Sequence, residues 1–140
     1  MLRKLTATSA TWATVPLRLV TGVAFIGHGA QKVLGSFGGP GLAKWLSFPA
    51  PFSFMRPSSA WMGVAAFAEL IGGLLILLGL FTRLGAFLLV CVMLTAMGSL
   101  WPRFFAPEGM ELASTFLAMG LALLILGGGQ LSVDRLITAR

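Results

Sequence analysis

Four long apolar stretches dominate this sequence, and each is close to the length that an α-helix needs to cross a lipid bilayer. They cover residues of about 15–34, 58–81, 84–101 and 110–127, and glycine, proline or charged residues separate them. A helix crosses the hydrocarbon core with about 20 apolar residues. Since hydrocarbon offers the backbone no hydrogen-bond partners, spanning segments must be helices or closed barrels. The pattern predicts an all-α polytopic membrane protein, a bundle of four transmembrane helices.

The composition excludes a water-soluble globular domain. Only 10% of the residues are charged and 57% are hydrophobic, whereas soluble domains carry about 25% charged residues. The mean hydropathy is +0.94. Four spans and their connections use all 140 residues, so residues 1–140 are expected to form a single transmembrane domain.

The net charge of +6 does not indicate nucleic-acid binding, because the ten lysines and arginines are scattered singly at the ends of the apolar stretches. Membrane proteins place their cations there. An even number of spans puts both termini on one side of the membrane. Five cations would share that side and three would lie opposite: Arg3, Lys4, Arg83, Arg135 and Arg140 against Lys44, Arg56 and Arg103. This bias favours a multi-pass protein of the inner membrane with both termini in the cytoplasm.

The connection between the first two apolar stretches, residues 35–57, is unusually aromatic. It contains four prolines and few polar residues, and its aromatic side chains are Phe37, Trp45, Phe48, Phe52 and Phe54. We expect an interfacial aromatic loop that lies on the bilayer surface or folds over the mouth of the bundle, with one short amphipathic turn at 42–47. An apolar loop that is merely packed against lipid remains an alternative.

The first apolar stretch carries a polar, glycine-containing stripe. At 100° per residue, six of its residues fall within an arc of roughly 120°: Arg18, Gly22, Phe25, His28, Gly29 and Lys32. Ionisable side chains inside a membrane are costly, and they face protein or trapped water. The other helices are therefore expected to pack over this stripe.

Glu69 is the single charged residue of the second apolar stretch and lies near its middle. We expect its carboxylate to lie against His28 and Lys32 as a neutralised cluster, with Glu111 at the outer mouth as a further acceptor. Arg18 could instead be the partner of Glu69, or its side chain could extend to the cytoplasmic interface.

The sequence predicts no metal site and no covalently bound cofactor. His28 is the only histidine and Cys91 the only cysteine, so there is no disulfide framework and no thiolate site. Haem ligation is disfavoured, because the sequence offers a single histidine as an axial ligand. A copper site of His28 with Met93 or Met97 is disfavoured, because no methionine lies at helical spacing from His28. Cys91 is expected to be an inert core residue.

The ordered set of motifs resembles the DoxX family of small four-helix membrane proteins, and the resemblance extends over nearly all of residues 16–137. The matching features are Arg18 with Gly22, residues 25–29 with Lys32, the glycine-proline segment 37–42, residues 69–73 with Gly79, Thr82-Arg83, Gly109 with Glu111, and residues 127–129 ahead of 131–134. One relative, DoxD, is a subunit of a thiosulfate:quinone oxidoreductase. Other members are linked to thiol-oxidant defence and to resistance to catechols and quinones.

The resemblance implies the four-helix fold and a role in membrane redox chemistry. The protein would be a quinone-interacting membrane subunit or anchor of a redox complex, in contact with the bilayer and with a soluble or membrane partner that carries the redox cofactor. The residues that could line a pocket for the quinone headgroup are His28, Lys32, Glu69, Arg18 and Glu111. The pocket needs hydrogen-bond donors for the carbonyls and nearby proton carriers.

A different class of function stays open. The same polar cluster could be a buried latch that fixes helix register in a structural bundle or a small-solute permease. The sequence assigns no catalytic residue, and a homo-oligomer remains open.

Overall fold

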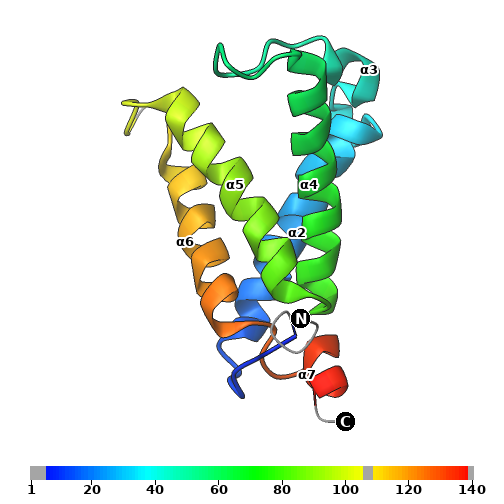
Figure 1. Cartoon of the computed structure of the whole chain (residues 1–140), viewed down its shortest axis with the longest axis vertical. Helices are drawn as coiled ribbons and strands as arrows, with labels where there is room; N and C mark the ends of the chain where they lie inside the picture. The colour runs from blue at the N-terminus through cyan, green and yellow to red at the C-terminus, as the bar shows by residue number, and fades with distance from the viewer. Residues whose placement is uncertain (1–5, 106–108, 139–140) are drawn as a thin grey trace.

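The computed structural model describes residues 6–105 and 109–138, and this part of the chain is helical without strands. The long helices are α2 (Thr14–Val33), α4 (Ser58–Leu78), α5 (Thr82–Leu100) and α6 (Glu111–Leu126). Short helices are η1 (Ser36–Gly38), α3 (Gly41–Leu46) and α7 (Val133–Thr138) (Figure 1). The long helices agree closely with the four predicted stretches. Arg3, Lys4 and Arg140, which entered the charge count, lie outside the described residues.

The turn between α4 and α5 makes these two helices antiparallel neighbours. α4 ends at Gly79, whose φ of 66° lies in the left-handed region that glycine adopts without steric cost. The Leu80 amide then donates to the Leu75 carbonyl oxygen at 3.0 Å. α5 begins again at Thr82, so the chain reverses within three residues.

The four long helices run alternately up and down and form two pairs. α2 packs most extensively on α4, and α5 packs most extensively on α6. Figure 1 shows the two pairs converging near α7 and separating toward α3. The two ends of the described chain meet at the α7 end, where the Thr138 hydroxyl donates to the Thr6 carbonyl oxygen at 3.1 Å.

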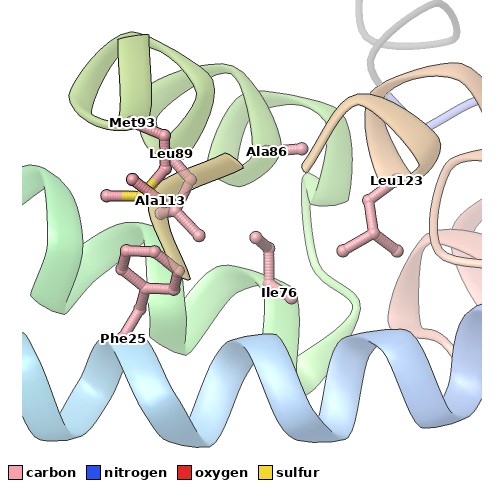
Figure 2. Close-up of a cluster of buried hydrophobic side chains, with 7 residues drawn as sticks. All are labelled: Phe25, Ile76, Ala86, Leu89, Met93, Ala113 and Leu123. Atoms are coloured by element: carbon pink, nitrogen blue, oxygen red, sulfur yellow. The ribbon is translucent and has the colours of Figure 1, made fainter. Parts of the chain in front are cut away.

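One hydrophobic core is shared by all four long helices (Figure 2). Its buried members are Phe25 of α2, Ile76 of α4, Ala86, Leu89 and Met93 of α5, and Ala113 and Leu123 of α6. This common core joins the α2–α4 pair and the α5–α6 pair into one bundle.

Glycines bring α2 and α4 into direct backbone contact. A Cβ added at Gly29 would lie 2.5 Å from the Leu70 amide nitrogen, and one added at Gly73 would lie 2.8 Å from the Ile26 amide nitrogen. Small residues permit this approach between membrane helices. The stripe predicted on this helix therefore faces α4, with Arg18 and Phe25 among its buried residues.

Two helices are long and apolar enough to cross a membrane by length and composition, among the residues that the structure describes. These are α4, with a mean hydropathy of 2.0, and α5, with a mean hydropathy of 1.8. α6 is apolar and has 16 residues. The crossing of all four helices stays a prediction.

Candidate functional site: an ion pair beside an apolar cavity

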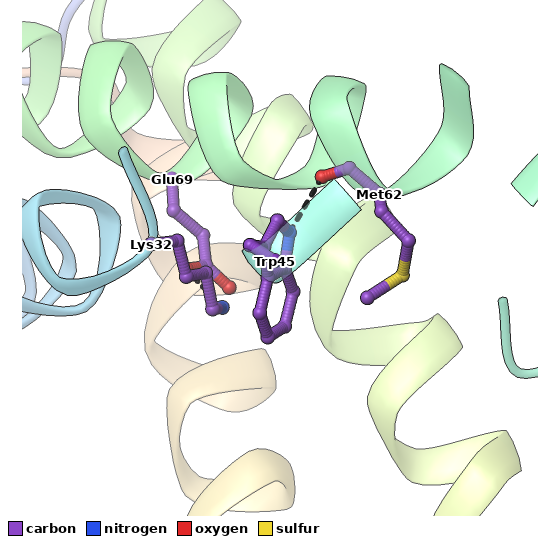
Figure 3. A network of polar contacts seen from close by, with 4 residues as sticks. All are labelled: Lys32, Trp45, Met62 and Glu69. Atoms are coloured by element: carbon purple, nitrogen blue, oxygen red, sulfur yellow. Dashed lines mark hydrogen bonds and ion pairs between the residues drawn. The ribbon is translucent and has the colours of Figure 1, made fainter. Parts of the chain in front are cut away.

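Lys32 of α2 and Glu69 of α4 form a partly buried ion pair (Figure 3). The Glu69 side chain is 4% exposed and the Lys32 side chain is 19% exposed. The backbone contact of Gly29 with Leu70 places the last turn of α2 beside the middle of α4. Glu69 thus faces the polar stripe, which confirms that part of the prediction.

Trp45 of α3 completes the surroundings of the ammonium group. The Lys32 Nζ atom lies 4.7 Å from the centroid of the Trp45 ring, a distance at which an aromatic face attracts a cation. The Trp45 Nε1–H donates to the Met62 carbonyl oxygen of α4 at 2.8 Å. The hydrogen bond fixes the indole, as Figure 3 shows, and the ammonium lies between a carboxylate and a ring face.

The ion pair borders a cavity of about 300 Å³ between α4 and α5. Lys32 and Glu69 supply its charged wall, and most of the remaining wall is apolar, with Trp61 of α4 and Val92 of α5 as examples. The cavity is partly open, and its volume lies at the lower end of the range for small-molecule sites. It can take a single planar ring with short substituents next to a hydrogen-bond donor.

The DoxX family model matches residues 13–102, which is more than half of the chain. The chain belongs to the DoxX family. DoxX is a membrane family, and two apolar helices agree with this character. Comparisons with curated proteins and with solved structures give no match.

Both residues of the ion pair, Lys32 and Glu69, lie within residues 13–102, the range matched by the DoxX family model. α6 and α7 lie outside the matched range. The motifs at Glu111, at residues 127–129 and at Asp134 therefore rest on the sequence resemblance alone.

His28 and Glu111 lie apart from the ion pair in this DoxX protein. His28 is exposed, and its ring contacts Phe25 edge to face at a centroid distance of 6.2 Å. Glu111 accepts a hydrogen bond from the backbone N–H of Phe105 in the preceding loop. Neither residue lines the cavity. Of the five predicted pocket residues, the structure brings together only Lys32 and Glu69.

Arg18 is not the partner of Glu69, which pairs with Lys32. The Arg18 side chain is buried, with 5% exposure, and it lies at the α7 end of the bundle. The guanidinium donates to the Ile76 and Leu77 carbonyl oxygens at 3.0 and 2.9 Å, and to three carbonyl oxygens of residues 128–131. The last carbonyl groups of a helix lack partners within it, and two of the arginine's N–H groups donate to two of these carbonyls at the end of α4.

Asp134 belongs to a motif noted in the sequence, but the sequence analysis did not predict the role of its side chain in the fold. Its side chain is 1% exposed, and its two oxygens accept from the Phe81 and Thr82 amides at 2.7 and 2.8 Å. A carboxylate at a helix N-terminus is favourable, and Thr82 begins α5. The signal was present, since Asp134 is the acidic residue of the short segment that follows the glycines at 127–129.

Cys91 does not lie in the core, contrary to expectation. It is exposed and lines the cavity. The core positions of α5 follow helical spacing through Ala86, Leu89 and Met93, and Cys91 falls between them. In the described ranges, no three His, Cys, Asp or Glu side chains are grouped so as to hold a metal ion.

Proposed function

We propose that this DoxX protein is a quinone-interacting membrane subunit, in which the cavity between α4 and α5 receives the quinone headgroup. One observation carries the proposal: a partly buried Lys32–Glu69 ion pair borders an apolar, partly open cavity of about 300 Å³. An ionisable pair at membrane depth marks a functional site by default.

The chemistry of the pair suits a ring carbonyl. An ammonium group has three donors, and only one is needed for Glu69. Another N–H group of the ammonium can donate a hydrogen bond to a quinone carbonyl oxygen. The Glu69 carboxylate is a nearby group that can accept and release protons. The apolar wall fits the ring. Electrons would come from a redox cofactor on a partner subunit.

The proposal includes four membrane crossings. α2 and α6 have 20 and 16 residues, lengths of roughly 30 Å and 24 Å at 1.5 Å per residue, near the bilayer thickness. Both described chain ends would lie on the cytoplasmic side of the inner membrane. Residues 35–57 would form the interfacial aromatic loop on the opposite side, with Phe37 and Phe54 at 81% and 73% exposure available to the headgroup region.

The contacts of Trp45 also favour the second candidate, a structural latch. Trp45, Lys32 and Glu69 tie α3, α2 and α4 together, and such a tie can set helix register without any ligand. The two candidates make different predictions for a variant that loses the pair but keeps the fold.

The test is the double variant Lys32→Met/Glu69→Leu, because replacing both members of a buried pair by apolar residues is often neutral for stability. Protein purified in native lipid nanodiscs is assayed for bound quinone by mass spectrometry and for melting temperature. Lys44→Met is the matched control, since Lys44 is exposed on α3 and lies outside the cavity lining.

We expect the parent and Lys44→Met to retain quinone and the folded double variant to lose at least about nine tenths of it. Equal quinone in the folded double variant would refute the cavity as the site. A parent that carries no quinone and binds none when it is added would leave the latch as the function of the pair.

A further inference from the structure

The surroundings of the Lys32 ammonium point to the kind of headgroup that the cavity accepts. We propose that Trp45 is a positioning residue that holds the Lys32 ammonium at the cavity wall, and that the resulting site selects neutral ring carbonyl compounds over anions. The selectivity rests on the proposed quinone function, whereas the positioning by Trp45 does not.

Two contacts leave the ammonium little freedom. The Glu69 carboxylate pairs with it from α4, and on the α3 side the centroid of the Trp45 ring lies 4.7 Å from Nζ. The indole is itself held by its hydrogen bond to the Met62 carbonyl oxygen. A lysine side chain has four flexible carbon atoms, so without the ring its ammonium group could turn away from the cavity.

The charge of the site favours a neutral ligand. Glu69 already neutralises Lys32, and the carboxylate itself lines the cavity. A second anion at hydrogen-bond distance from Nζ would lie close to this carboxylate, and repulsion between like charges is strong in a surrounding of low dielectric constant. A carbonyl oxygen accepts the same hydrogen bond without bringing a net charge into the apolar cavity.

Of the four tryptophans, Trp45 is the one whose ring lies over the Lys32 ammonium in the described part of the chain. Trp61 also lines the cavity. Trp101 is 71% exposed and lies outside the cavity lining. It therefore offers a matched control for the loss of an indole.

The binding test uses duroquinone, a neutral benzoquinone with four methyl groups, and its analogue in which one methyl is replaced by a carboxylate. Parent, Trp45→Phe, Trp45→Leu and Trp101→Leu are compared in nanodiscs. We expect the parent to bind duroquinone at least about tenfold more tightly than the carboxylate. Trp45→Leu should weaken duroquinone binding about tenfold, because the ammonium is no longer held at the cavity wall by the ring face. Trp45→Phe keeps a ring face and should restore most of the affinity.

A readout without any ligand separates positioning from a loss of folding. The rate at which an amine-acylating reagent modifies Lys32, mapped by mass spectrometry, should rise severalfold in Trp45→Leu and stay near the parental rate in Trp45→Phe and Trp101→Leu. The acylation rate of Lys44 would rise if α3 became less ordered as a whole. We expect this rate to be the same in the parent and in all three variants.

The results distinguish the two proposals. Duroquinone binding by Trp45→Leu at the parental affinity, or equal binding of the carboxylate by the parent, overturns the inference and leaves the proposed function standing. A parent that binds neither compound refutes the proposed function, and the acylation rate then decides alone whether Trp45 positions Lys32. An unchanged rate in Trp45→Leu overturns the positioning role.

Discussion

The guanidinium of Arg18 lies directly against Gly79, the residue that ends α4. A Cβ added at Gly79 would come within 2.7 Å of the Arg18 Cζ atom. The close approach lets Arg18 reach the Ile76 and Leu77 carbonyl oxygens while it also binds the carbonyls after α6. The absence of a side chain at position 79 is thus a condition for the polar contacts at this end of the bundle.

Gly79→Ala should lower the stability of the protein by at least about 2 kcal/mol. Left-handed backbone costs an alanine roughly 1–2 kcal/mol, and the displaced Arg18 loses hydrogen bonds. Gly38→Ala is the control, because Gly38 has a φ of 74° but an added Cβ meets nothing within 4 Å. The melting temperature in detergent should fall clearly more for Gly79→Ala, and equal falls would show that Arg18 does not depend on the glycine.

Gly29→Ala should separate α2 from α4. The added methyl would meet the Leu70 backbone, which cannot turn aside as a flexible side chain can, and overpacking costs about 1–3 kcal/mol. Gly27→Ala lies on the same helix and meets nothing within 4 Å, so it should be neutral or stabilising by up to about 1 kcal/mol. Melting curves of the two variants check the expectation. A destabilised Gly27→Ala would show that helix backbone effects dominate over packing.

Lys32→Met should be more destabilising than Glu69→Gln. Losing lysine leaves a carboxylate on a side chain that is only 4% exposed, and breaking a buried pair costs about 3–5 kcal/mol. Glutamine keeps an oxygen that can accept from Lys32, whose ammonium also retains the Trp45 ring. Thermal unfolding of both variants gives the ranking, and the reverse order would refute the account of the pair.

Single cysteines at the two ends of the bundle should label from opposite sides of the membrane. Ser47→Cys and Ile137→Cys, each in a Cys91→Ala background, place thiols at exposed positions. Because three proposed spans separate them, a membrane-impermeant thiol reagent added to intact cells should modify position 47 and spare position 137. Labelling at position 137 alone would invert the topology, and labelling at both would contradict three crossings.

The helices were predictable because glycine and proline mark their ends. Pro57 immediately precedes the first residue of α4, and Gly79 immediately follows its last residue. The Lys32–Glu69 pair was predictable for another reason: an unpaired charge is unstable in an apolar surrounding, so the few charges within the long stretches had to find partners.

Other parts of the site depended on packing that a sequence pattern does not contain. An arc of roughly 120° could not show that His28 is exposed while its neighbour Gly29 is buried against α4. The partners of Arg18 are backbone carbonyl groups, which every residue carries and no motif marks. Trp45 is placed beside Lys32 by the glycine- and proline-rich connection between α2 and α3. Contacts between residues distant in the sequence determine the path of this connection.

The convergence of the two helix pairs has a consequence for how the cavity can change size. In the described part of the chain, the hydrogen bonds that tie α5 and α6 to α7 and to the segment before α2 lie near the α7 end. A 3.9 Å contact between Thr21 and the Met119 sulfur joins α6 to α2. At the α3 end, no described hydrogen bond or ion pair joins α5 or α6 to α2, α3 or α4. Widening there replaces side-chain packing by lipid packing, and lipid tails are as apolar as leucine. If the cavity receives a quinone as proposed, it would admit rings of different bulk at little cost, while the opposite end keeps the helices in register.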